Sequence, residues 1–229
     1  MKRSGKAVVW IVVVAVLFLI AGFVVFSFTG KAKDLGVRYT SKDFQNVSKK
    51  AGVIKDAIPV SGKRSDYTYN WSGKVNVNAV YSQEELTAWF DSNRPSYSPF
   101  KNVQIKINND GTVEASANVD FKSIADYYLT PEERKYVPSF IPSAAPMYAK
   151  GTLSVTNNVV HLNPEKITIG LVPVPSNLLT PTNVSYLETK IESLIAETPN
   201  LYVETLKVQD GKIVYKGTGP KTLTRVKKP

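Results

Sequence analysis

Hydrophobic and polar residues alternate along the chain in patterns that predict antiparallel strands separated by amphipathic helices. Apolar residues repeat at helical spacing after Thr40 and after Ser82, and each of these residues is followed three positions later by an acid, as in a capping box. A longer helical pattern covers 184–194. Period-two alternation predicts strands over 67–77, 103–119, 153–172 and 203–215. Long strands with a few helices between them predict an α+β domain.

The N-terminal residues follow neither pattern. Residues 7–26 carry no charge, and as a helix they would rise about 30 Å, the thickness of a hydrocarbon core. Lys2, Arg3 and Lys6 precede this run, and no acid comes before Asp34, so the positive-inside rule predicts a cytoplasmic N-terminus. A cleaved signal peptide is the alternative, but its apolar core is usually shorter, about 7–15 residues.

These patterns predict three parts. Residues 1–30 form a cytoplasmic tip and a transmembrane anchor, residues 31–39 a juxtamembrane linker, and residues 40–229 an extracytoplasmic α+β domain with a basic C-terminal tail. The predicted location is therefore the cell membrane, with a single pass and the domain outside.

Composition narrows the chemistry. The 229 residues include 29 Lys and Arg, 19 Asp and Glu, one His and no Cys, so disulfides, thiolate zinc sites and cysteine nucleophiles are excluded. A basic domain at a membrane surface is attracted to anionic headgroups or anionic wall polymers. The predicted location outside the cell argues against nucleic acid as a binding partner. The candidates for an anionic surface are the basic residues of the tail: Lys221, Arg225, Lys227 and Lys228.

No pattern in the chain predicts catalysis. His161 lies on a predicted strand, and the chain has neither a G-x-S-x-G nucleophile elbow nor a glycine-rich phosphate loop. The acids around Asp110 lack the spaced ligands of a calcium loop and fit a hairpin turn instead. We therefore expect no catalytic residue, metal or cofactor, and a protein that is not an enzyme.

Two segments are candidates for contact with lipid. Tyr69 and Trp71 share a strand face. This face is either a platform on which sugars or acyl chains stack or a half-buried part of the core, and aromatic residues at period two usually belong to the core. Residues 138–147, PSFIPSAAPM, are apolar, and their prolines predict an irregular segment. That segment either touches a membrane or lines a pocket mouth, or else crosses the core. Its candidate lipid contacts are Phe140, Ile141 and Met147.

The last third of the chain resembles a known family. Residues 167–175 run into the helix at 184–197, and the hairpin around Asp210-Gly211 follows. This order is similar to the C-terminal part of bacterial membrane-anchored or secreted tubular lipid-binding (TULIP-like) proteins, over roughly residues 100–219. The resemblance implies a curved antiparallel sheet that wraps around a helix and encloses an apolar groove for acyl chains. It implies no catalytic residues.

The fold class predicted is thus α+β, with an N-terminal single transmembrane helix followed by a curved antiparallel sheet packed with amphipathic helices. The predicted function is a membrane-anchored, extracytoplasmic lipid-binding or lipid-carrying protein of a bacterial envelope. One alternative is a structural or interaction module with a filled core that binds an envelope protein or wall polymer. A weaker alternative is a cell-envelope hydrolase, which would gather acids around His161 in one cleft.

Overall fold

The computed structural model describes residues 31–55, 62, 66–92, 94–128 and 143–228, and these form an α+β domain in which strands predominate. The elements up to residue 120 are α2 (Ser41–Ala51), β1 (Ile54–Lys55), β2 (Tyr67–Ser72), β3 (Val75–Tyr81), α3 (Gln83–Asp91), β4 (Phe100–Ile107) and β5 (Val113–Asp120). Those after it are α4 (Phe121–Tyr128), β6 (Ala144–Thr156), β7 (Val159–Ile169), β8 (Val172–Pro173), η2 (Ser176–Leu178), α6 (Pro181–Glu197), β9 (Tyr202–Gln209), β10 (Lys212–Gly219) and β11 (Thr222–Lys227).

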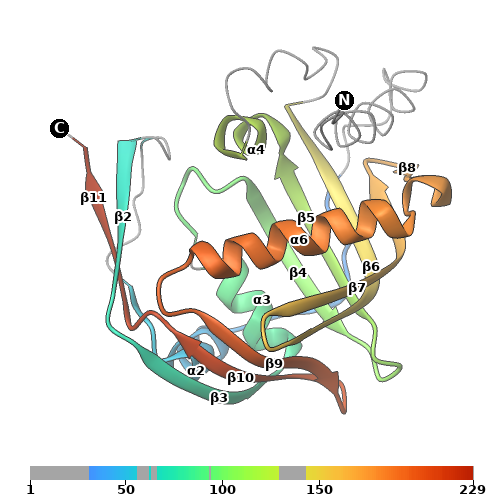
Figure 1. Ribbon diagram of the computed structural model, residues 1–229. Coiled ribbons are helices and arrows are strands. Elements are labelled where there is room, and N and C mark those ends of the chain that lie inside the picture. The colour runs from blue at the N-terminus through green and yellow to red at the C-terminus, as the bar shows by residue number, and fades with distance from the viewer. Residues whose placement is uncertain (1–30, 56–61, 63–65, 93, 129–142, 229) are drawn as a thin grey trace, which may run out of the picture.

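The large sheet has eight strands, in the order β3-β10-β9-β6-β5-β4, with β7 paired to β6 and β8 paired to β7. Its branching is set by β6. Residues 144–151 of β6 pair with β5, residues 155–156 pair with β9, and β7 pairs along 147–156. Since a strand has only two edges, β5 and β9 share one edge of β6. The sheet therefore divides into a β5-β4 branch and a β9-β10-β3 branch that curve around a common interior (Figure 1).

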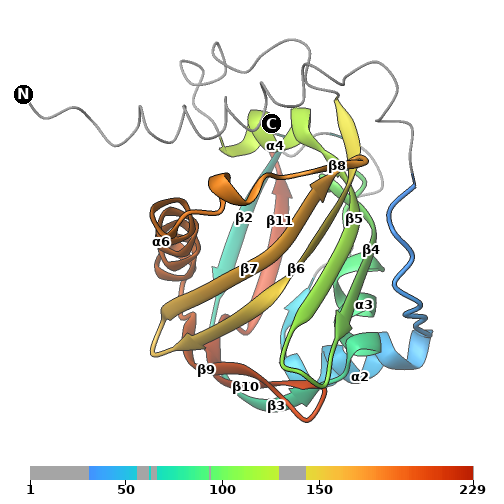
Figure 2. The same ribbon diagram turned by 90° about the vertical axis from the view of Figure 1, so that its right-hand side faces the viewer.

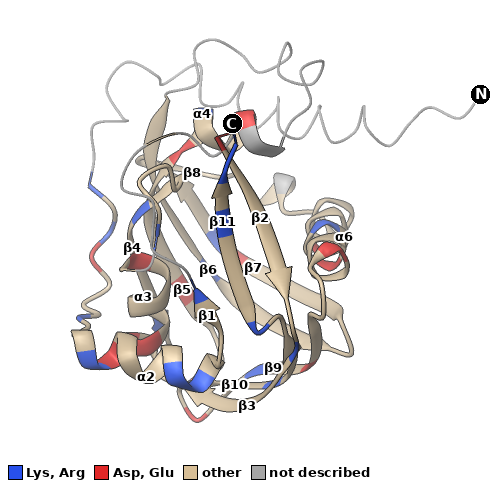
Figure 3. Ribbon diagram, turned by 90° about the vertical axis from the view of Figure 1, so that its left-hand side faces the viewer, with Lys and Arg blue, Asp and Glu red and all other residues tan. Residues whose placement is uncertain are grey.

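A second, three-stranded sheet has the order β1-β11-β2. β11 runs antiparallel to β2 and parallel to the short β1. Figures 1 and 3 show β2 and β11 standing opposite the β5, β6 and β7 part of the large sheet. This arrangement gives the domain two sheet faces that look toward each other.

The helix starts and hairpin turns follow from local sequence. Thr40 with Asp43 and Ser82 with Glu85 form the two capping boxes predicted, each satisfying backbone N–H groups at a helix N-terminus. β4 pairs with β5, and β9 pairs with β10, as antiparallel hairpins whose turns contain Gly111 and Gly211. Both glycines have positive φ, which is why glycine is favoured there.

Two hydrophobic clusters hold the branches together. In the first, α2 and α3 bring Val47 and Trp89 against Tyr81, Ile107 and Ile213. The second joins α6 to the β6–β7 hairpin and β9. Its buried members are Val155, Val160, Ile195 and Val203. Leu206 and Tyr215 pack against both clusters, so the core is continuous along the interior of the curve.

The predicted fold class is corrected in one respect. It placed a transmembrane helix ahead of the sheet, and no helix in the part of the chain that the structure describes is long and apolar enough to cross a membrane. The longest, α6, has 17 residues and carries Glu188, Lys190, Glu192 and Glu197, so it is both short and charged. Residues 7–26, on which the prediction was based, lie outside the described residues.

The segment from residue 31 to 39 follows the outer face of the large sheet. Leu35 and Val37 are buried against Tyr148 of β6, and the backbone N–H of Leu35 donates to Gln104 of β4 at 2.9 Å. Lys33 reaches the carboxylate of Glu114 on β5 at 3.6 Å. The residues just before the domain are thus part of its packing.

The proline-rich segment is only partly irregular. Residues 138–142, including Phe140 and Ile141, lie outside the described residues, but β6 begins at Ala144 and contains Pro146 and Met147. The prediction of an irregular segment is wrong for this half. Pro146 accepts a hydrogen bond from Gly170 on the β7 side of β6, where the β7 ladder begins only at Met147. Proline has no N–H to donate to β7, but Pro146 lies at the end of the β6–β7 ladder, where no such donor is required. The strand therefore tolerates Pro146.

Candidate functional site

One face of the large sheet is apolar across four strands. The registers place Ile105 beside Ala115, Ala115 beside Ala149, and Ala149 beside Ile167, which makes one continuous row from β4 to β7. The neighbouring row joins Ala117, Met147 and Ile169. We call these two rows the apolar face. The opposite face carries polar residues such as Lys106, Glu114 and Lys150, because successive strand residues point to opposite sides.

The apolar face is not sealed by the core. Ala115 is exposed, and Ala117, Met147 and Ala149 are half-buried, although they lie at the centre of the sheet. Alanine side chains are short, so a ligand could approach the backbone more closely here than over the isoleucines of β4 and β7. An exposed apolar surface of this kind is a common sign of a binding surface.

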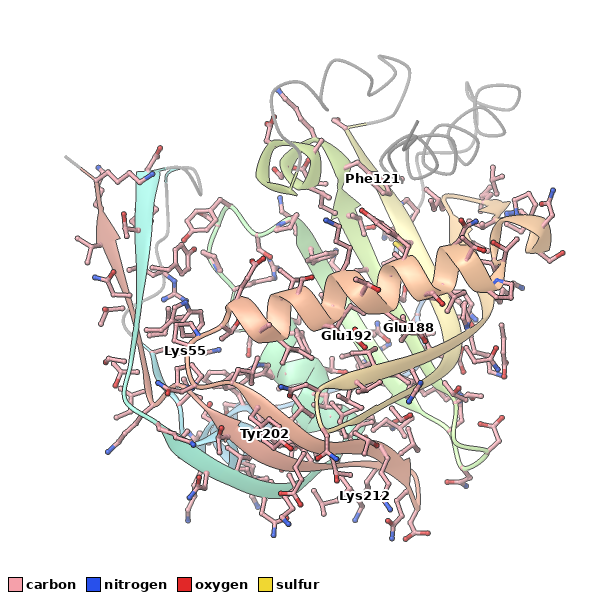
Figure 4. The ribbon with its side chains drawn as sticks, viewed as in Figure 1. Lys55, Phe121, Glu188, Glu192, Tyr202 and Lys212 are labelled. Carbon is pink, nitrogen blue, oxygen red and sulfur yellow. The ribbon has the colours of Figure 1, made fainter. Side chains whose placement is uncertain are left out.

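The helices contact the edges of this sheet. Helix α6 lies beside β7 (Figure 2). Its Glu188 and Glu192 (Figure 4) accept hydrogen bonds from the backbone N–H groups of Leu162 at 2.7 Å and Val160 at 2.9 Å, on the edge of β7. Four residues of a helix rise about 6 Å, and two residues of a strand rise about 6.6 Å. Because these two lengths are nearly equal, helix side chains at positions i and i+4 can each accept from every second N–H group along the strand.

The opposite edge is covered in the same way by α3. Gln83 and Asp91 accept from the N–H groups of Ile107 and Val103, while Thr87 both accepts from and donates to the backbone of Ile105. Thr87 is fully buried. Both helices therefore satisfy strand edges that would otherwise present unpaired N–H groups, and neither is held flat against the apolar face.

One side of α6 is apolar and partly exposed. Leu187 and Leu194 are seven residues apart, and Ile191 lies between them on the same side of the helix. Ile191 packs with the second cluster, whereas Leu187 and Leu194 are 47% and 48% exposed. These two leucines give α6, which packs beside β7, an exposed apolar side of its own.

The three-stranded sheet presents a different face toward the interior. Its registers place Lys55, Leu223 and Trp71 in one row, and Arg225 beside Tyr69 in the next. Leu223 is buried, so this is the inward face. Lys227 and Tyr67 continue it toward the end of β11. We call these residues the cationic face; the basic positions on β1 and β11 are visible in Figure 3.

Lys55 is the unusual member of the cationic face. Its ammonium lies 3.4 Å from the ring centroid of Trp89 on α3, a cation–π contact. Burial, and to a smaller extent the nearby guanidinium of Arg225, lower the pKa of Lys55 to about 8. Trp89 also packs against the cluster that contains Ile107, so one side chain links Lys55 to the apolar sheet.

The structure brings some predicted site residues together. Tyr69, Trp71, Arg225 and Lys227 share the cationic face, and the Arg225 guanidinium lies 5.8 Å from the Tyr69 ring centroid. Met147 belongs to the apolar face. Lys221 and Lys228 flank β11 and are exposed. Phe140 and Ile141 lie outside the described residues.

Sequence reasoning missed Lys55 and the extent of the apolar face. The alternation of Ala115 and Ala117 is visible in the sequence, but its pairing with Met147 and Ala149 is not. No periodicity marks Lys55, because β1 has only two residues.

A polar depression of about 630 Å³ lies between α2, α3 and β3. Its central charges satisfy each other, since Lys50 donates to both carboxylate oxygens of Glu85 at 2.7 Å, and Glu85 also caps α3. His161 is exposed on β7 opposite Ser154, and within the described ranges no hydrogen bond or carboxylate contact engages it. Neither feature forms a catalytic arrangement.

The comparisons with known proteins add no assignment: no family model, no curated protein and no solved structure matches this chain.

Proposed function

We propose that this chain binds a lipid-type amphiphile and that the acyl chain lies on the apolar face of the large sheet. The observation that carries the proposal is the row from Ile105 to Ile167, which is apolar in all four strands and yet accessible at Ala115. Each methylene that leaves water for such a surface contributes about 0.8 kcal/mol.

An acyl chain suits this face better than a second protein does. The three-stranded sheet stands opposite the face, and α6 runs along its β7 edge (Figures 1 and 2). A flat protein surface would have to displace these elements, whereas a single chain need not. Leu187 and Leu194 would cover the chain from the helix side.

The resemblance to tubular lipid-binding proteins and the location in a bacterial envelope stay predictions. The location rests on residues 7–26, outside the described residues, and binding by the domain does not depend on it.

The test is photo-crosslinking of the full chain with a fatty acid that carries a diazirine at mid-chain. We expect labelled peptides from β5, β6 and α6. Leu187→Gln with Leu194→Gln should reduce labelling severalfold while leaving stability nearly unchanged, since both side chains are about half exposed. Thr189→Gln with Ser193→Gln, on the opposite, exposed side of α6, is the matched control.

Labelling that avoids these strands, or that is equal in the two double variants, would contradict the proposal. An absence of labelling in the wild-type chain would favour the interaction module with a filled core.

A further inference from the structure

We infer that the head group of the bound amphiphile is anionic and that the Lys55 ammonium binds it. This inference rests on the proposed function and specifies its ligand class: a long-chain carboxylate rather than a neutral alcohol or ester. Lys55 belongs to the cationic face, which stands across the interior from the apolar face (Figures 1 and 4).

The described neighbours of Lys55 on the cationic face supply no negative charge. Lys55 and Arg225 are diagonal neighbours on one side of the three-stranded sheet, because Lys55 pairs with Leu223 and Arg225 lies two residues further along β11. The other members of that face are aromatic, aliphatic or basic. Among the described residues, the structure gives the Lys55 ammonium no carboxylate partner.

The contact with Trp89 does not complete the coordination of the ammonium. A lysine carries three N–H donors, and a ring face engages it without a hydrogen-bond acceptor. Lys55 has no hydrogen-bond acceptor among the described side chains and backbone. Figure 4 shows Lys55 between the three-stranded sheet and α3. A carboxylate brought by a ligand would supply both the charge and the acceptors.

The geometry also connects head and chain. Trp89 contacts Lys55 on one side and packs with the cluster of Ile107 and Val113 on the other. Ile107 and Val113 pair with each other on the same side of the sheet as Ile105 and Ala115. A ligand with its carboxylate at Lys55 would therefore meet an unbroken apolar path toward the apolar face.

The test compares two photoactivatable probes of equal chain length, a fatty acid and the corresponding fatty alcohol, on the full chain at pH 7. We expect the acid to label the wild type about tenfold more efficiently at limiting concentration, the difference that one charge-assisted hydrogen bond produces. Lys55→Met should abolish the difference and keep the labelling by the alcohol. Lys55→Arg, which keeps the charge, and Lys212→Met, which removes an exposed one, should both retain the preference.

The outcomes separate the two proposals. Equal labelling of the wild type by acid and alcohol, or a preference that survives in Lys55→Met, overturns the anionic head group and leaves chain binding intact. Labelling by neither probe overturns the proposed function itself. Acetate should not displace the acid probe, and displacement by acetate would show a site for small anions instead of an amphiphile.

Discussion

Removing the charge of Lys55 should stabilise the ligand-free protein. Burial lowers the pKa of Lys55 from its ordinary value of 10.5 to about 8, and the difference corresponds to at most about 3 kcal/mol by which folding disfavours the protonated side chain. Lys55→Met keeps an unbranched apolar stem over Trp89 and removes the ammonium. We expect the free energy of unfolding at pH 7 to rise by about 1–3 kcal/mol.

The gain should depend on pH in a defined direction. Because the folded state has the lower pKa, the penalty on the wild type is fully present below pH 8 and disappears as the pH rises from about 8 toward 10.5. Among the described residues, Arg225 is the charged group that also acts on Lys55, and it stays protonated throughout this range. The variant should therefore be the more stable protein at pH 7, and the two should converge near pH 10.

Denaturant unfolding at pH 7 and pH 10, followed by circular dichroism, measures this difference. Lys212→Met is the control, since Lys212 is exposed on β10 and its removal should change stability by less than about 0.5 kcal/mol at either pH. A Lys55→Met protein that is equally or less stable than the wild type at pH 7 would refute the argument that folding disfavours the protonated Lys55 side chain.

Two further predictions concern the frame of the sheet. Replacing Glu188 and Glu192 by Ala should destabilise the protein by about 1–3 kcal/mol for each backbone N–H of β7 left unsatisfied, and it should speed hydrogen exchange at these amides. Replacement by Gln keeps an acceptor and should keep the amides protected. Equal exchange rates in the Ala and Gln variants would exclude this contact. Gly217→Ala should destabilise the protein strongly, because the added Cβ would clash with the carbonyl oxygen of Tyr202, while a Cβ at Gly219 on the same strand meets nothing within 4 Å. Similar melting temperatures for Gly217→Ala and Gly219→Ala would disprove the clash.

The elements of this fold could be predicted where their causes are local. A cap at Thr40 or Ser82 depends on an acid three residues away, and a hairpin turn depends on a glycine that takes positive φ between two alternating runs. Such signals lie within a few residues of each other. For this reason both capping boxes, both glycine turns and the amphipathic helix of α6 agree with the structure.

The candidate site could not be predicted in the same way, because it depends on strand pairing. Ala115 and Ala149 are 34 positions apart and become neighbours only when β5 pairs with β6. Lys55 joins the cationic face through a parallel pair with β11, and only two residues of β1 take part. The alternation of a single strand shows which residues share a face, but not which faces meet.

The way the helices are attached explains why the apolar face stays accessible. A helix that packs across a sheet directs its apolar side onto the strands, but α3 and α6 direct polar side chains at i and i+4 onto strand edges instead. Their apolar residues pack into the two hydrophobic clusters instead, Leu86 and Trp89 from α3 and Ile191 and Ile195 from α6. Within the described residues, no helix covers the centre at Ala115 and Ala149. A face that is apolar, paired on both edges and uncovered at its centre does not aggregate through its edges, and the proposed binding of an acyl chain requires such a face.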